Sequence, residues 1–364
     1  VHVAAPKHHT WAPEGFDLKD LEAKLGVTVH KVPLSRRGQN PIVEIISLVG
    51  IAWLISKLKP DVVHLITMKP ILYGGLSARI LGTKGVTISI TGFGHVFSSS
   101  GVLAGVRRVL VSALLRLVVR HRNCNVIVQS DGDSVFLAQG KIANQPNQVR
   151  VIRGSGVDLA LFSESTEPPD GPPVVLLAAR LLWDKGVGEF VEAARQLRAK
   201  NKEVRFVLAG DTRPDNPRSV PRSTLEAWNA EGIVSWIGRQ ENMPKLLASC
   251  AIACLPTKYG EGVPRFLIEA AASGRPIIAT DIAGVREIVS DRWNGILVPE
   301  ANVPALVDAL STLIENREMR AEMGQRSRTL AEKNFDVETV AQDTVSVYQG
   351  LLSRSSSATN SLLG

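Results

Sequence analysis

The chain has 364 residues, of which 45% are hydrophobic, and its formal net charge is +7 at neutral pH. This length allows one large or two ordinary hydrophobic cores, and two domains with a cleft between them are the better expectation. The positive charge favours anionic partners over basic ones. No uninterrupted apolar run reaches the length of a membrane span and no signal segment is recognised, so we expect a cytoplasmic setting.

Short apolar runs alternate with helical patterns along the whole chain. In the first half, strands are predicted at 1–5, 27–32, 61–66, 86–90 and 125–129. The alternation restarts in the second half, with strands predicted at 174–179, 204–209, 234–237, 251–255, 276–279 and 296–298. Apolar strands separated by helices are typical of buried parallel sheets. We therefore predict an α/β fold with two doubly wound domains.

A polar, proline-rich segment separates the two halves. Residues 162–173 cannot form a central strand, because prolines lack the N–H group that the ladder requires. We predict a first domain at 1–161 and a second at 174–335, with 162–173 as the linker. Residues 336–352 are predicted to form a helix that packs back on the first domain, and the serine-rich tail 353–364 is predicted to be disordered.

Two basic residues follow the first strand of the second domain. The sequence Arg180-Leu-Leu-Trp-Asp-Lys185-Gly186 precedes a helical pattern, which places both side chains at the carboxyl edge of the sheet. Arginine offers phosphate a planar fork, lysine offers a mobile point charge, and a helix amino terminus adds N–H donors. The pattern predicts a diphosphate site; the alternative is a solvated loop with a surface ion pair.

Two glutamates bracket the start of a later helix. They lie at the ends of Glu261-Gly262-Val263-Pro-Arg-Phe-Leu-Ile-Glu269. Carboxylates so placed can accept hydrogen bonds from the hydroxyls of a sugar and of a ribose, while the free N–H groups of Gly262 and Val263 face phosphate. A glutamate at a helix start is also favoured by the helix dipole alone, so a purely structural role is the alternative.

Four ordered motifs resemble family 4 of the retaining nucleotide-sugar glycosyltransferases. These are Ala179-Arg180-Leu-Leu-Trp-Asp-Lys185-Gly186, Glu261-x7-Glu269, Gly274-Arg-Pro-Ile-Ile-Ala-Thr-Asp281-Ile-Ala-Gly284-Val-Arg286-Glu287 and Asn294-Gly295-Ile-Leu-Val-Pro299. The resemblance implies the GT-B fold, in which two Rossmann-like domains face each other. It also implies catalytic roles at the diphosphate for Arg180 and Lys185 and at the donor sugar for Glu261. Glu269 is expected to bind the ribose hydroxyls, and donor contacts are also expected from Gly262, Val263 and Arg239.

The first half resembles a bacterial branch of this family that acts on lipid-linked oligosaccharides and surface polysaccharides. That branch includes polyprenyl-diphosphate-sugar N-acetylgalactosaminyltransferases. The likeness lies in Asp61-Val-Val-His64-Leu-Ile-Thr-Met-Lys69-Pro70-Ile-Leu-Tyr73-Gly74-Gly75 and Ile90-Thr91-Gly92-Phe93-Gly94-His95-Val-Phe97. It implies donor contacts from Gly92 and Gly94 and acceptor-side contacts from Thr91, His95, His64 and Lys69. A plain turn at 91–94 and a core position for His64 are the alternatives.

The resemblance further implies the reaction and its partners. A hexose or N-acetylhexosamine moves from a UDP-sugar to a lipid-linked or polysaccharide acceptor with retention of configuration, and no cofactor or metal ion is required. The basic amphipathic stretch 102–122 predicts peripheral contact with an anionic membrane, at its inner face, or else a core-packed helix with a solvated basic side. No motif predicts nucleic-acid binding. Nothing in the sequence indicates an oligomeric state.

Two rival functions follow from the same patterns. One is a GT-B-fold sugar-nucleotide epimerase, which needs an acid and a base on either side of the sugar. The other is a non-catalytic protein that binds a sugar nucleotide or a membrane surface. The opening residues Val1 to Pro6 resemble the second strand of the family, so the first strand, loop and helix are missing from the pattern. We expect the chain to be part of a longer protein; a protein that truly lacked them would favour the non-catalytic function.

Overall fold

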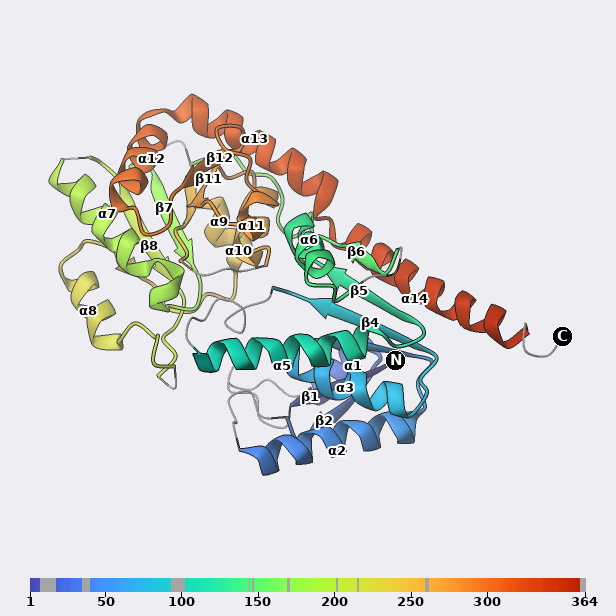
Figure 1. The fold of residues 1–364 in the computed structure, drawn as a ribbon. Helices are drawn as coiled ribbons and strands as arrows, with labels where there is room; N and C mark the ends of the chain where they lie inside the picture. Colours follow the sequence, from blue (N-terminus) through green and yellow to red (C-terminus); the bar gives the residue numbers. More distant parts are fainter. Residues whose placement is uncertain are drawn as a thin grey trace.

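The computed structural model describes residues 1–6, 18–34, 40–92, 102–143, 145, 147–168, 171–200, 202–214, 216–258 and 262–360. Two α/β domains follow one another along the chain, as Figure 1 shows. Every named strand pairs in parallel with its neighbours. The connections between parallel strands run through helices, so the α/β expectation is met.

The first domain contains two parallel sheets. Strands β1 (His2–Pro6) and β2 (Thr28–Val32) form one, and the other has the order β3 (Val62–Ile66), β4 (Gly85–Ile90), β5 (Cys124–Val128) and β6 (Val149–Val151). The helices are α1 (Leu18–Leu25), α2 (Pro41–Leu58), α3 (Met68–Ile80), α5 (Val102–Val119) and α6 (Asp131–Gln139). Apolar side chains of β3, β4 and β5 pack against α3 and α5 and form the core of this domain.

The second domain has one continuous sheet of six strands. Its order is β12 (Gly295–Val298), β11 (Ile277–Thr280), β10 (Ile252–Leu255), β7 (Val174–Ala178), β8 (Arg205–Ala209) and β9 (Ser235–Trp236). The connecting elements are η1 (Trp183–Lys185), α7 (Val187–Ala199), α8 (Arg222–Ala230), α9 (Met243–Ala248), α10 (Arg265–Ala272), α11 (Ala283–Arg286), α12 (Val303–Glu315) and α13 (Arg317–Asn334). One hydrophobic cluster covers each face of the sheet, as a doubly wound fold requires.

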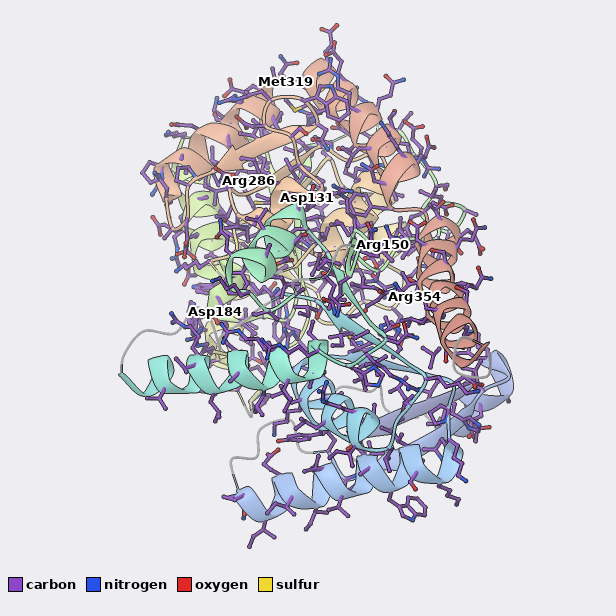
Figure 2. All side chains as sticks on the ribbon, turned by 45° about the vertical axis from the view of Figure 1, so that its right-hand side comes forward. Asp131, Arg150, Asp184, Arg286, Met319 and Arg354 are labelled. Atoms are coloured by element: carbon purple, nitrogen blue, oxygen red, sulfur yellow. The ribbon has the colours of Figure 1, made fainter. Side chains whose placement is uncertain are left out.

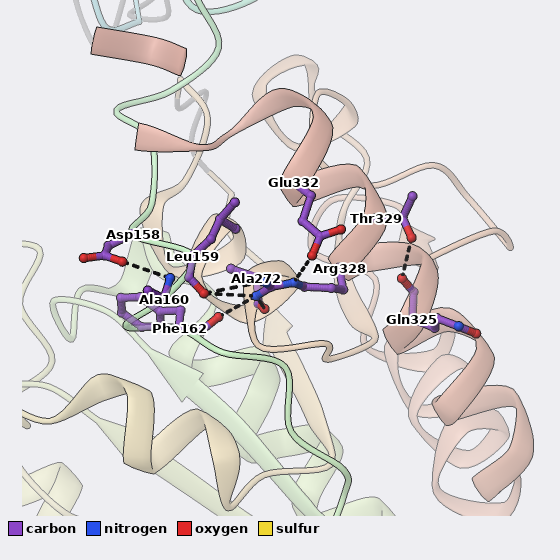
Figure 3. A network of polar contacts seen from close by, with 9 residues as sticks. All are labelled: Asp158, Leu159, Ala160, Phe162, Ala272, Gln325, Arg328, Thr329 and Glu332. Atoms are coloured by element: carbon purple, nitrogen blue, oxygen red, sulfur yellow. Dashed lines mark hydrogen bonds and ion pairs between the residues drawn. The ribbon is translucent and has the colours of Figure 1, made fainter. Parts of the chain in front are cut away.

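The chain passes between the domains twice, and the two passages are bonded to each other. The N–H of Val157 donates to the carbonyl of Phe335 at 2.7 Å, and the N–H of Val337 donates to the carbonyl of Val157 at 3.0 Å. Arg328 on α13 then donates to the carbonyls of Phe162 and Ala272 (Figure 3). Because a charged donor strengthens each bond, these contacts hold the interdomain segment against the second domain.

The last helix, α14 (Val337–Asn360), leaves the second domain and packs on β3, β4 and β5 of the first. The prediction that the tail from residue 353 onward is disordered was wrong up to Asn360, because an existing helix extends at little cost. Arg354 adds a hydrogen bond of 3.0 Å to Asn125, and the carbonyl of Leu351 accepts one of 2.7 Å from Asn123. Residues 361–364 lie outside the described part of the chain.

Candidate active site

The strand order of the second domain reverses direction between β7 and β10. Strands β7 and β10 are neighbours, but the chain continues from β7 toward β8 and β9 and from β10 toward β11 and β12. The loops after β7 and β10 therefore leave the carboxyl edge of the sheet in opposite directions. This is the topological switch point at which open α/β sheets bind their ligands.

The loop after β7 carries the two predicted cations. Arg180 is exposed, and its side chain has no hydrogen bond or ion pair within the described part of the chain. Lys185 ends the single turn η1, and Gly186 follows with φ of +73°. A Cβ atom on Gly186 would overlap the carbonyl oxygen of Pro256, so only glycine lets this turn approach the loop after β10 so closely.

Further contacts join the same two loops. The carbonyl of Asp184 accepts hydrogen bonds from the N–H of Lys258 at 2.8 Å and from the hydroxyl of Thr257 at 3.0 Å. The Lys258 ammonium pairs with Glu189 on α7, and the Asp184 carboxylate pairs with Arg218 at 2.7 Å. The basic motif and the loop that leads to the glutamate motif are therefore side by side. Glu261 itself lies outside the described residues.

Glu269 lies inside α10, which begins directly after Pro264. Its side chain is buried, with 7% of the residue exposed, and it accepts a hydrogen bond from Arg265 at 2.8 Å. Burial raises the pKa of the Glu269 carboxyl, and the Arg265 guanidinium lowers it by a smaller amount. A buried carboxylate with a single charged partner retains capacity to accept hydrogen bonds from hydroxyl groups.

Gly262, in the loop before α10, is in close contact with Thr91 and Gln129 of the first domain. A Cβ atom on Gly262 would lie 2.5 Å from the carbonyl oxygen of Thr91 and would overlap the side chain of Gln129. The Val263 N–H, which we expected to be free for phosphate, donates to Gln129 Oε1 at 3.3 Å. Gln129 is not among the predicted site residues, because the pattern predicts it as the last residue of a strand; its position at a carboxyl edge was the available signal.

Two of the predicted first-domain residues are engaged elsewhere. His64 Nδ1 lies 2.6 Å from the Tyr348 hydroxyl on α14, and its Nε2 lies 2.6 Å from the Ser89 hydroxyl. Burial lowers the pKa of His64 and favours the neutral ring, so this side chain belongs to the contact between α14 and the sheet. Lys69, at the start of α3, forms an ion pair of 2.6 Å with Glu44.

The remaining predicted residues fall into two groups. Gly92 follows Thr91 at the carboxyl edge of β4 with φ of +119°, while Gly94 and His95 lie outside the described residues. Arg239 is exposed after β9, and the preceding Gly238 accepts a hydrogen bond of 2.7 Å from the N–H of Gly210 after β8. Arg239 therefore lies at the same carboxyl edge of the sheet as Arg180, and strand β8 separates the two positions.

A cluster of ion pairs beside α6 joins the two domains. Arg153 donates to Glu287 of the second domain at 2.7 Å and to Asp131 of the first at 2.8 Å. The N–H of Asp131 donates to the same glutamate at 3.3 Å. Asp131 and Asp133 form an Asp-x-Asp sequence that the sequence reading overlooked. Within the described residues, no group of three or more His, Cys, Asp and Glu is arranged to hold a metal ion.

These features define a class of protein. Two α/β domains, with a basic turn at the switch point of the second beside the loop after β10, are those of a GT-B glycosyltransferase. The family model for glycosyl transferases group 1 matches residues 160–330, and the glycosyl transferase 4-like model matches residues 13–130. The two models together span most of the chain, which belongs to this glycosyltransferase family.

Individual relatives agree with the family. The N,N'-diacetylbacillosaminyl-diphospho-undecaprenol alpha-1,3-N-acetylgalactosaminyltransferase of Campylobacter jejuni is 28% identical over 90% of this chain and 87% of its own length. An Escherichia coli UDP-Gal:alpha-D-GlcNAc-diphosphoundecaprenol alpha-1,3-galactosyltransferase is 23% identical, over 84% and 79% respectively. The crystal structure of Anabaena HepE in complex with UDP has a TM-score of 0.72 at 19% identity, covering 91% of this chain and 89% of that one.

Proposed function

We propose that this glycosyltransferase moves a hexose or N-acetylhexosamine from a UDP-sugar to a lipid-linked or polysaccharide acceptor, with retention of configuration. The observation that carries the proposal is the exposed Arg180 beside Lys185 at the switch point, next to the loop that leads to Glu261. The two relatives named above act on diphospho-undecaprenol sugars, and the similar HepE structure contains UDP.

In this proposal the donor bond breaks and the acceptor bond forms on the same face of the sugar. The bond between the anomeric carbon and the diphosphate oxygen breaks, the acceptor oxygen bonds to that carbon, and its proton passes to the departing diphosphate. Arg180 and Lys185 stabilise the charge on the leaving group, which is commonly the largest contribution to catalysis. They do so without a cofactor or metal ion in our proposal. Glu269 would hold the ribose hydroxyls and Glu261 the donor sugar.

We also place the enzyme peripherally at the inner face of the cell membrane. The proposal follows from the acceptors of the two relatives, because a polyprenyl chain is held in the bilayer. The net charge of +7 is favourable for a membrane surface that carries anionic lipids. Peripheral contact would let the enzyme reach a diphosphate headgroup while its donor site remains open to water.

The test of the donor site is calorimetry with UDP. Arg180→Ala and Lys185→Ala are each expected to weaken UDP binding by about 1–3 kcal/mol, the usual contribution of a hydrogen bond to a charged group. Arg222→Ala is the matched control, because Arg222 pairs with Glu226 on the surface of the same domain. Unchanged UDP affinity in both variants would overturn the assignment. Turnover of a labelled UDP-sugar with and without a lipid-diphosphate acceptor then separates transfer from epimerisation and from binding alone.

A further inference from the structure

Helix α2 presents a continuous apolar stripe to its surroundings. The stripe residues are each between 51% and 67% exposed, and they are Ile42, Ile45, Ile46, Val49 and Trp53. Their spacing of three, four, seven and eleven residues places them on one side of the helix. A monomeric soluble protein rarely leaves so many large apolar side chains together in water. The stripe therefore needs a covering partner.

Helix α5 repeats the same pattern. Its exposed apolar residues follow an identical spacing, and they are Val106, Val109, Leu110, Ala113 and Leu117. Helix α3 packs against both α2 and α5 and joins them. In Figures 1 and 2 the three helices lie along the same side of the first domain, while α14 lies on the other side of β4 and β5. We call the outer side of α2, α3 and α5 the apolar face.

The way α2 is attached decides its orientation toward a bilayer. By length and composition alone α2 could cross a membrane, although our sequence reading expected no such segment. Its other side, however, is part of the folded domain: Leu54 and Ile55 are buried, and Ser47 donates to the carbonyls of Pro33 and Val43. A helix packed against β2 and α3 in this way can lie on a membrane but cannot cross it without unfolding the domain.

The charged residues of the three helices are mainly basic. The three helices contain a single acidic residue, Glu44, and six basic ones, namely Lys57, Lys69, Arg79, Arg107, Arg108 and Arg116. Glu44 is engaged by Lys69 and by the Tyr73 hydroxyl. Lys57 lies 4.9 Å from the ring centre of Trp53, at the far end of the stripe. An apolar stripe that ends at a tryptophan with a lysine over its ring, on helices whose charged residues are mainly basic, matches a surface of anionic lipid.

We propose that the apolar face is the membrane-docking surface, with α2 and α5 lying in the interface of an anionic bilayer and inserting their two stripes. The inference deepens the proposed membrane contact by naming the surface, and it does not require transfer activity. In the middle of α2, Ser47 and Gly50 contact Pro33, which directly follows the carboxyl end of β2. Docking by this face therefore keeps the carboxyl end of β2 close to the lipid surface.

Flotation of the protein with vesicles tests the docking surface. Vesicles of phosphatidylglycerol and phosphatidylcholine are expected to carry the parent protein upward, and pure phosphatidylcholine much less. The double variant Ile45→Ser/Val49→Ser is expected to bind the anionic vesicles about tenfold more weakly, since it loses two buried aliphatic side chains. Val345→Ser is the control, because Val345 is similarly exposed but lies on α14. Equal binding by the double variant and the parent would overturn the proposal.

A second measurement does not depend on weakened binding. Brominated anionic lipids quench tryptophan that inserts into them, so they are expected to quench the parent more than Trp53→Phe. Equal quenching would exclude insertion of α2. If light scattering showed that the parent is a dimer and the double variant a monomer, the stripe would be a protein interface and the proposal would be wrong. UDP affinity, measured on every variant, reports the donor domain separately, so failure of docking and failure of the donor site are distinguishable.

Discussion

The two domains share the α/β architecture but differ in how completely they bury their apolar side chains. The second domain has one six-stranded sheet covered on both sides, and its exposed large apolar residues, among those described, are Trp183, Ile237 and Trp293. The first domain has two smaller sheets and two exposed apolar stripes on α2 and α5. The difference indicates that the second domain buries its large apolar side chains within its own fold, whereas the first leaves many of them exposed, as our docking proposal requires.

The sheets of the two domains also differ in the continuity of their backbone hydrogen bonds. In the second domain the ladder is continuous from β12 to β9. In the first, β1 pairs with β2 and β3 pairs with β4, but the described residues include no pairing between β1 and β3. Each of these two strands has an edge whose backbone groups lack a ladder partner.

The largest loss of stability is expected at Gly186, where the second domain depends on close backbone packing. Gly186→Ala combines a left-handed φ with an overlap at Pro256, so we expect a loss of about 3 kcal/mol or more in unfolding free energy. Gly82→Ala in the first domain has a similar φ of +67° and open space around it, so about 1–2 kcal/mol is expected. Urea unfolding measures both. Equal losses would mean that the Pro256 contact does not matter for stability.

A smaller effect, this time on turnover, is expected for a substitution at the contact between the two domains. In Gly262→Ala the new methyl would strike the carbonyl of Thr91, so the domains must separate slightly. We expect turnover to fall about 10- to 100-fold, because reacting groups tolerate little misplacement. Gly132→Ala is the matched control, since its Cβ would lie 3.8 Å from that of Ala283 across the same boundary. Equal turnover in the two variants would argue against a role for this contact.

The smallest effect concerns pH. Burial raises the pKa of Glu269, and the carboxylate form is the one that accepts ribose hydroxyls in our proposal. UDP affinity is therefore expected to be full above this pKa and to weaken as the pH falls through it, by at most about tenfold per unit. In Glu269→Gln the side chain does not titrate, so this acid-side loss should disappear. Calorimetry from neutral to mildly acidic pH compares the two; parallel pH profiles would contradict the role of Glu269.

Local sequence patterns predicted most of the architecture. All the strands predicted in both halves are present within one or two residues, because apolar strands in parallel sheets leave a clear periodic signal. Strand β6, at Val149–Val151, was not predicted, since three residues are too few for such a signal. The extension of α14 to Asn360 was also missed, because a serine-rich sequence has no apolar pattern of its own.

The donor site was predictable in part. The order of the motifs located Arg180, Lys185 and Glu269 on one sheet edge, since loops after parallel strands meet there. The contacts of His64 with Tyr348 and of Val263 with Gln129 were not predictable. Each joins residues more than a hundred positions apart, on different domains or on a helix that returns from one domain to the other. No local pattern contains that information.

The sequence by itself determined the two α/β domains and the family and proposed Arg180 and Lys185 for the donor site, because each inference depends on residue types at short spacing. Only the tertiary structure decided which groups are already engaged, how Gly262 meets the first domain, and which sides of α2 and α5 are exposed. A helix that is apolar on all sides, as α2 nearly is, does not indicate which side its own fold will cover. That choice is made by packing against β2 and α3, which long-range contacts alone establish.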